Sequence, residues 1–283
     1  MSNGGIIGVV NTPTSTAASG VWTLEEQFLA RAANIWPIGV PNVVSNAQVW
    51  LDAADASTIT ASGGDVSQWN NKGTLGNFTQ GTGALQPKTG VTTLNGRNVI
   101  DFAADYMTSA DTAATYKFLH DGTDYLFALV GKVSSAPSGW FGNNQGSGDF
   151  AGMYWYSSVT TNVWHGVSRG VAGTSNTLNQ ANSSISSNTF AIQTVLADPD
   201  NGTAANRSSI FINAGSAIKN NTQTNAVSAS NPTYALQVGT LGGNYGEPLT
   251  GSIAELIIVS GADATEGNRV IIRDYLNTKW GVY

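Results

Sequence analysis

The chain has 283 residues, only 11% of them Asp, Glu, Lys or Arg, and a formal net charge of −6. The 12 Lys and Arg residues form no basic run and there is no cysteine, which argues against nucleic-acid binding and excludes disulfides and thiolate metal sites. The 33 glycines, abundant Asn, Ser and Thr, and 8 tryptophans favour an all-β protein with long polar loops. No apolar stretch approaches the roughly 20 residues that span a bilayer.

The first 20 residues carry no charged side chain and predict either a flexible tail or an arm that becomes ordered on a partner. A short helix is expected over Thr23–Trp36, because Thr23 and Glu26 form a capping box and Pro37 ends the segment. Its apolar stripe has no partner in the neighbouring sequence, so we expect it to dock on the following domain or on another subunit. Residues 37–47 have the composition of a linker.

Short strands separated by polar loops are expected from Gln48 onward. The sequence Asn95-Gly96 is a hairpin turn signal. The spacing predicts an antiparallel sandwich. The expected strands are Val49–Leu51, Asp65–Trp69, Val99–Phe102, Tyr125–Val133, Met153–Tyr156, Asn162–Val167, Phe190–Leu196, Ser209–Asn213 and Ala235–Thr240.

The last residues predict a buried strand followed by a helix that lies on the sheet. Ile253–Val259 is apolar at both alternate sets of positions except for Glu255, which indicates a strand covered on both faces. Asp263 and Glu266 have capping-box spacing, and the helix that follows carries an apolar stripe ended by Gly281. Glu255 is expected to accept hydrogen bonds inside the domain, because a buried carboxylate must be paired.

Several of these segments together resemble one known fold family. They read VWLDAADASTIT, DVSQWNNKG, LNGRNVIDF, GSIAELIIVS and YLNTKWGVY. In this order they resemble the concanavalin A-like lectin/glucanase jelly rolls, most closely the laminin-G-like type of bacterial and phage surface proteins. The resemblance covers residues 48–283. It implies an all-β jelly-roll sandwich of two antiparallel sheets, whose concave sheet often bears a sugar or protein ligand.

The N-terminal sequences GIIGVVNTPT and GVWTLEEQFLARAANIWP resemble the leader of structural proteins of tailed phages. This resemblance implies that residues 1–47 anchor the chain to a virion and that residues 48–283 form the displayed domain. It also implies synthesis in the host cytoplasm and location in the virion. The anchoring residues expected on this basis are Ile6, Ile7, Trp22, Leu24, Phe28, Ile35 and Trp36.

The acidic and histidine residues do not predict catalysis. A retaining glucanase of this fold needs two carboxylates in an E-x-D-x-E-type pattern, and none of the glutamates of this chain stands in that pattern. His120 and His165 lack metal-ligand spacing, and no G-x-S-x-G sequence is present. We therefore expect no enzyme, cofactor or metal. Calcium at Asp52, Asp55 and Asp65 is an alternative, although the first two also fit a turn-capping pattern.

Aromatic residues on successive strands give the best indication of a binding site. In MYWYS, Tyr154 and Tyr156 share one face and Trp155 points the other way. One face would stack on a sugar, or all these rings would fill the core of the sandwich. The candidate carbohydrate-binding residues are Trp140, Asn143, Asn144, Asp149, Tyr154, Trp155, Trp164 and His165.

The sequence therefore predicts a noncatalytic virion protein. The first hypothesis is a tail-fibre or appendage component that recognises a host-surface glycan, with a homo-oligomer, commonly a trimer in fibres. The second is a capsid decoration or head-fibre protein whose sandwich adorns or stabilises the shell. Both hypotheses expect contacts to other virion proteins through the N-terminal arm, and neither expects nucleic-acid binding or membrane insertion.

Overall fold

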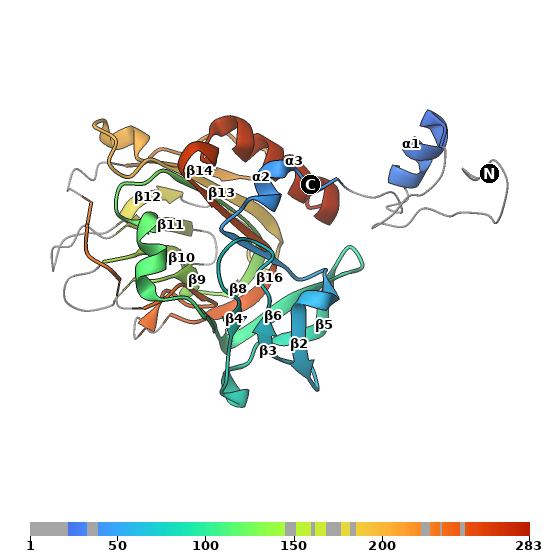
Figure 1. Cartoon of the computed structure of the whole chain (residues 1–283). Helices are drawn as coiled ribbons and strands as arrows, with labels where there is room; N and C mark the ends of the chain where they lie inside the picture. Colours follow the sequence, from blue (N-terminus) through green and yellow to red (C-terminus); the bar gives the residue numbers. More distant parts are fainter. Residues whose placement is uncertain are drawn as a thin grey trace. The chain divides into compact units, whose positions relative to one another are not determined.

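The computed structural model describes residues 22–32, 39–144, 151–159, 162–167, 177–181, 185–221, 227–232, 234–243 and 247–283 (Figure 1). Contacts between residues divide the chain into two units, Met1–Pro41 and Asn42–Tyr283. No helix among the described residues is long and apolar enough to cross a membrane.

The first unit contains helix α1 (Leu24–Ala32). The predicted capping box at its start is confirmed: the Thr23 backbone N–H donates to the Glu26 carboxylate at 2.9 Å, and the Glu26 N–H donates to the Thr23 hydroxyl at 3.2 Å. Leu24 and Phe28, one helical turn apart, are 84% and 71% exposed. The expected anchoring residues Ile6, Ile7, Ile35 and Trp36 lie outside the described residues.

The second unit is an antiparallel β structure, and its described residues include the α-helices α2 (Asn42–Ser45) and α3 (Glu266–Trp280). Its strands are β1 (Val49–Asp52), β2 (Ile59–Ser62), β3 (Asp65–Trp69), β4 (Phe78–Thr79), β5 (Lys88–Leu94), β6 (Arg97–Asp105), β7 (Met107–Ser109), β8 (Tyr125–Ser135), β9 (Ser138–Gly142), β10 (Met153–Val159), β11 (Asn162–Val167), β12 (Thr177–Ala181), β13 (Ala191–Ala197), β14 (Ser208–Ile212), β15 (Gln237–Val238) and β16 (Leu249–Ser260). Short 3₁₀ helices are η1 (Ala56–Thr58), η2 (Gly83–Leu85), η3 (Ala113–Leu119), η4 (Ala204–Asn206) and η6 (Gly261–Asp263).

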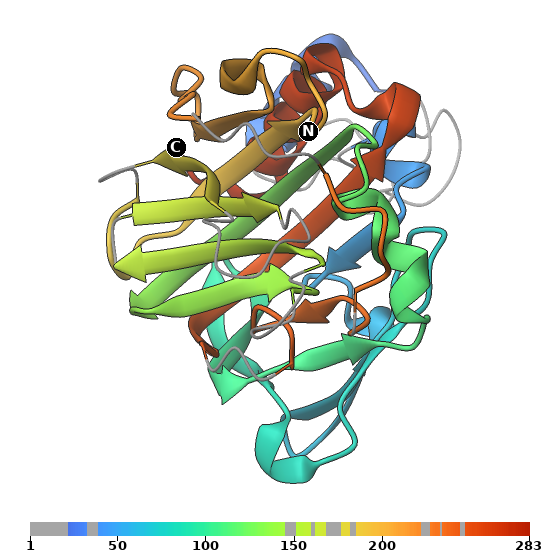
Figure 2. The same ribbon diagram turned by 90° about the vertical axis from the view of Figure 1, so that its left-hand side faces the viewer.

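The strands hydrogen-bond in the order β12-β11-β10-β9-β15-β7-β4-β3-β5-β6-β16-β8-β13-β14, and β1 pairs with β16. The hydrogen-bonded strands fold over into two layers. In Figure 2 the strands β9–β12 run in front of β8, β13 and β16. The predicted all-β sandwich is confirmed.

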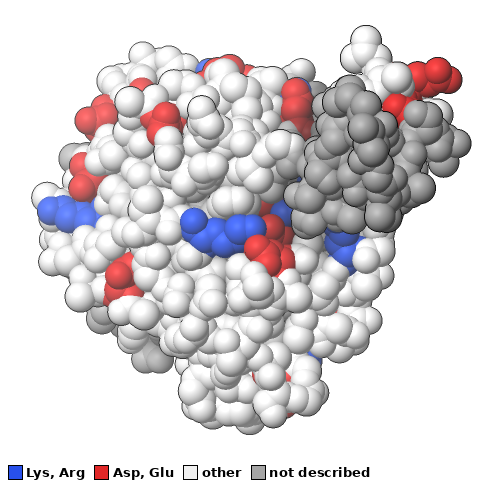
Figure 3. Space-filling model, turned by 45° about the vertical axis from the view of Figure 1, so that its right-hand side comes forward, with Lys and Arg blue, Asp and Glu red and all other residues white. Residues whose placement is uncertain are grey.

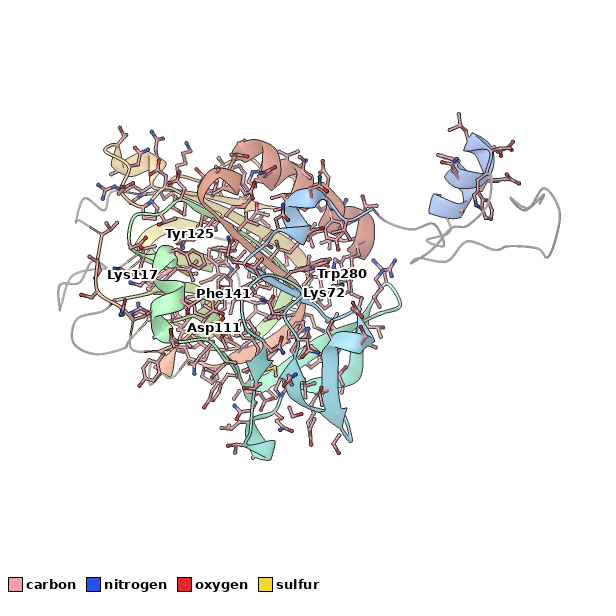
Figure 4. All side chains as sticks on the ribbon, in the orientation of Figure 1. Lys72, Asp111, Lys117, Tyr125, Phe141 and Trp280 are labelled. Atoms are coloured by element: carbon pink, nitrogen blue, oxygen red, sulfur yellow. The ribbon has the colours of Figure 1, made fainter. Side chains whose placement is uncertain are left out.

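The core lies between these two layers. Phe127 on β8 meets Phe141 on β9 edge to face at 4.9 Å between ring centroids, and Trp155 on β10 at 5.1 Å. Figure 4 labels Phe141 and Tyr125 in this interior. Because strand side chains alternate, the other side of β9–β12 faces away from the core.

Strand β16 is covered on both faces, as its two apolar sets predict. Leu256 and Ile258 belong to the core between the layers, whereas Glu255 faces α3. Helix α3 buries the predicted stripe of Ile272, Leu276 and Trp280. The predicted cap at Asp263 is wrong, because Asp263 lies in η6 and the Thr265 hydroxyl accepts from the Asn268 N–H instead.

The structure confirms the predicted hairpin turn and shortens the predicted linker. The hairpin at Asn95-Gly96 is confirmed: the two residues join β5 to β6 with φ of 49° and 77°, the left-handed conformation that the turn requires. The predicted linker over residues 37–47 is too long. Helix α2 buries Val43 and Val44 and contacts β16 and α3, so the compact unit begins at Asn42.

Candidate functional site

Three aromatic side chains form a continuous group on the side of the sheet that faces away from the core. Tyr156 on β10 stands opposite Trp164 on β11 in the strand register. The rings of Tyr154 and Tyr156 meet edge to face at 6.5 Å between centroids, and those of Tyr156 and Trp164 at 5.8 Å. Tyr156 and Trp164 are partly exposed and Tyr154 is 7% exposed. We call these three residues the aromatic face.

The alternation of the strand explains why the neighbouring residues point the other way. Trp155 lies between the two tyrosines, has no exposed surface, and donates its indole N–H to the Gln193 side chain on β13 at 2.9 Å. This contact crosses the core from one layer to the other. The predicted split of MYWYS into two faces is therefore confirmed, and the inner face is the one that carries Trp155.

Four of the predicted sugar contacts lie in the interior instead. Trp155 crosses the core. Trp140 donates to the Ser157 hydroxyl at 2.8 Å, and the Asn143 side chain accepts from the Met153 N–H at 2.8 Å. His165 lies between Tyr125 on β8 and Ser208 on β14. All four are 0% exposed. A side chain without exposed surface offers no area to a sugar, so their assignment as ligand contacts is corrected to a role in the core. Asp149 lies outside the described residues.

Two polar groups near the aromatic face lack hydrogen-bond partners among the described residues. They are the indole N–H of Trp164 and both amide atoms of Asn144, whose side chain is 1% exposed. Asn144 follows β9 two residues after Gly142, which stands opposite Tyr154. A buried polar group without a partner costs roughly 1–3 kcal/mol. These atoms have almost no exposed surface, so a ligand does not reach them in this structure.

Gly166 fixes the position of the Tyr154 ring. The two residues are register partners on β10 and β11. A Cβ atom at Gly166 would lie 1.8 Å from a carbon of the Tyr154 ring, so the ring lies across the backbone of the neighbouring strand. Only glycine leaves room for this arrangement. Tyr156 and Gly166 were not among the predicted site residues, although the i, i+2 spacing of the two tyrosines in MYWYS indicated the first of them.

The buried carboxylate of Glu255 is occupied by four donors, as the sequence predicts. Its oxygens accept from the Trp50 and Trp280 indoles at 2.7 and 2.6 Å, and from Lys279 at 2.7 Å. The Tyr275 hydroxyl donates at 3.1 Å. Figure 4 labels Trp280 in this junction between α3 and the sheet. Glu255 therefore holds the terminal helix in place.

The aspartates considered as calcium ligands are paired with lysines. Lys72 lies 3.2 Å from Asp52 and 2.8 Å from Asp55, and Lys88 pairs with Asp65. The Lys72 ammonium holds the pKa of Asp55 below its usual value, mainly through this hydrogen bond. Figure 3 shows basic side chains beside acidic ones on one side of the molecule. The part of the chain that the structure describes contains no group of three or more His, Asp or Glu side chains placed to hold a metal ion.

No protein family model and no curated protein matches the chain, but solved structures do. A mutant Trypanosoma rangeli sialidase displaying trans-sialidase activity has a TM-score of 0.52 at 9% identity, covering 90% of this chain and 36% of the sialidase chain. Domain 4 of AbnA, an arabinanase from Geobacillus stearothermophilus in complex with arabinotriose, has a TM-score of 0.47 at 11% identity. The match covers 81% of this chain and 98% of that domain. The carbohydrate-binding module CBM40 of Ruminococcus gnavus IT-sialidase, bound to α2,3-sialyllactose, has a TM-score of 0.41 at 14% identity. The match covers 56% of this chain and 85% of the module.

The likeness to the sialidase agrees with the all-β sandwich seen here and concerns the fold alone. This chain spans 34% to 36% of the length of two such sialidase chains.

Proposed function

We propose that the aromatic face binds a glycan. The observation that carries this proposal is the chain of three edge-to-face rings on the outer side of β10 and β11, two of them partly exposed. Binding sites for small polar molecules combine aromatic walls with a few placed polar groups. Sugar rings present C–H surfaces that can stack on the partly exposed rings of Tyr156 and Trp164.

We further propose that the site binds without cleaving. Retaining glycoside hydrolysis needs two carboxyl groups about 5–5.5 Å apart on either side of the scissile bond. Glu255 is buried and engaged by four donors, and Glu266 pairs with Arg269 at 2.6 Å. Glu25 and Glu26 belong to the first turn of α1 in the other unit. The fifth glutamate, Glu247, is partly exposed, and its carbonyl accepts from the Gly139 N–H on β9 at 2.8 Å. Retaining hydrolysis would need a second carboxyl group placed beside it.

A glycan array probed with the full chain tests the proposal. Trp164→Ala and Tyr156→Ala should each abolish binding while the melting temperature stays close to that of the unchanged protein. Tyr283→Ala is the matched control, because Tyr283 is an aromatic residue that is 51% exposed at the end of the chain, outside the aromatic face. Binding that survives both face substitutions, or an array without any bound glycan, would reject the proposal.

We also propose that the N-terminal segment attaches the displayed domain to a virion, as the resemblance of the leader implies. A tail-fibre or appendage component is the first form of this proposal, and a capsid decoration protein is the second. Its support is the exposure of Leu24 and Phe28 on one side of α1, an apolar surface suited to a protein partner. Such a surface would associate with copies of itself or with other virion proteins.

Charge substitutions in α1 test the attachment. In the full chain, Leu24→Asp with Phe28→Asp should lower the oligomer mass in analytical ultracentrifugation or prevent incorporation into particles. Glu25→Gln is the control, because it changes an exposed residue of the same helix without changing the apolar surface. An unchanged mass together with normal incorporation would contradict the attachment role.

A further inference from the structure

The outer sheet that carries the aromatic face contains no formal charge. Its strands β9, β10, β11 and β12 read SGWFG, MYWYSSV, NVWHGV and TLNQA, without a single Asp, Glu, Lys or Arg. The one titratable imidazole, His165, is buried on the core side between Tyr125 and Ser208. The strands themselves therefore present no ionic side chain to a ligand. A described charge beside them is acidic: the Glu247 carbonyl accepts from the Gly139 N–H on β9 at 2.8 Å, and the Glu247 side chain is partly exposed.

Basic residues are also rare in the surrounding sequence. Between Lys132 and Arg207 the chain has one Lys or Arg, Arg169, which lies outside the described residues. The chain as a whole carries a net charge of −6, which repels anions at long range. A bound carboxylate, sulfate or phosphate needs charge-assisted hydrogen bonds to replace its lost hydration. The strands β9–β12 carry no Lys or Arg side chain to balance such a charge.

From this arrangement we infer that the ligand of the aromatic face is an uncharged glycan, built of neutral hexose or N-acetylhexosamine units. This inference rests on the proposed function. Such a ligand can stack the C–H surfaces of its rings on Tyr156 and Trp164, which are partly exposed, without an ionic partner.

The neutral character of the site has a measurable consequence. Attraction between charges is screened by salt, with a Debye length that falls from about 10 Å at 0.1 M to about 3 Å at 1 M. Binding by ring stacking and neutral hydrogen bonds lacks this dependence. The affinity for the preferred glycan should therefore change by less than about twofold between 0.05 and 0.5 M sodium chloride, whereas recognition of an anionic sugar would weaken strongly.

The experiment compares matched oligosaccharides with the full chain by titration calorimetry. One series is neutral, and the other carries a terminal sialic acid, a uronic acid or a sulfate on the same core. Neutral members should bind at least about tenfold more tightly, which corresponds to about 1.4 kcal/mol. Arg169→Ala should leave the affinity for the neutral series within about twofold, because no ion pair is required.

The outcomes separate this inference from the proposed function. A preference for the charged series, loss of binding in Arg169→Ala, or a strong decline with salt would overturn the uncharged ligand while leaving glycan binding intact. Equal binding of both series would also overturn it, since the charge would then be irrelevant to recognition. Absence of binding to every sugar, or binding that Trp164→Ala does not change, would reject the proposed function and this inference with it.

Discussion

The ammonium group of Lys279 lies 2.7 Å from a carboxylate oxygen of Glu255, a residue with no exposed surface at the centre of β16. The same ammonium lies 2.7 Å from Asp52 on β1. One lysine of the last helical turn thus bridges two buried carboxylates on adjacent strands. The contact ties α3 to the sheet on the side opposite the layer that bears the aromatic face.

Removal of this lysine should destabilise the protein strongly. Lys279→Met leaves the buried Glu255 carboxylate without its cation and leaves Asp52 with Lys72 alone. Removing one partner of a buried ion pair costs about 3–5 kcal/mol. Urea unfolding should show that loss. Lys88→Met is the control, because Lys88 and Asp65 are 50% and 35% exposed and such surface pairs contribute about 1 kcal/mol or less. Equal effects of the two substitutions would contradict the role given to Lys279.

Trp155 and Trp164 should respond to truncation in different ways. Trp155→Ala opens a cavity in the core and removes the hydrogen bond to Gln193, so it should cost about 3–5 kcal/mol of unfolding free energy. Trp164→Ala should cost less and should act on glycan binding. Thermal melts and binding assays on both variants measure the difference. A stable Trp155→Ala protein that has lost only its ligand would show that the inner and outer faces are wrongly assigned.

Protonation of His120 should lower the unfolding free energy of the domain at acidic pH. Burial lowers the pKa of His120 below its ordinary 6.5, against smaller opposing effects of the Ser230 carbonyl and Asp121. Its Nε2 contacts the Ser230 carbonyl oxygen at 2.8 Å, while Nδ1 has no partner among the described residues. Below about pH 6.5 the unfolded chain binds a proton that the native ring resists, so the unfolding free energy declines as the pH falls through this window.

The variant His120→Gln isolates this contribution. Its unfolding free energy should change less between pH 7 and pH 5 than that of the unchanged protein, because the titrating ring is gone while an amide N–H remains to face Ser230. Chemical denaturation at the two pH values measures both slopes. Identical slopes would mean that His120 does not control the acid response.

A methyl group at Gly166 should disturb both the ligand site and the fold. The added Cβ would collide with the Tyr154 ring and force it off the neighbouring strand. We expect Gly166→Ala to weaken glycan binding by about tenfold or more and to cost about 1–3 kcal/mol of stability, the usual range for overpacking. Gly81→Ala is the control, because its Cβ would meet nothing within 4 Å. Unchanged affinity in Gly166→Ala would remove Tyr154 from the site.

The regular parts of this fold follow from local sequence patterns. Burial on both faces makes both alternate sets of β16 apolar, and burial on one face gives α3 its apolar stripe. The positive φ of the turn is signalled by Asn95-Gly96. Strands such as β15, with two residues, were placed only roughly. Their pairing depends on β7 and β9, which are distant in the sequence.

The aromatic face was predicted only in part for a related reason. Alternation in MYWYS shows that Trp155 and Tyr156 point in opposite directions, but both sides of the strand are aromatic, so the pattern does not identify the core side. The core side is identified by Gln193 on the opposite layer, whose side chain accepts a hydrogen bond from the Trp155 indole. The helix cap is Thr265 rather than Asp263, because the short helix η6 takes up Asp263 and α3 begins after it.

The most direct test of the glycan-binding face is a nuclear magnetic resonance titration of the ¹⁵N-labelled full chain. Its 8 tryptophans each contribute one indole N–H signal, and Trp164→Phe identifies the one in question. A bound neutral oligosaccharide should shift the Trp164 signal saturably. The signals of Trp155 and Trp280 should stay in place, since their indoles donate to Gln193 and Glu255 in the interior. Saturable binding that leaves the Trp164 signal unmoved would contradict the account.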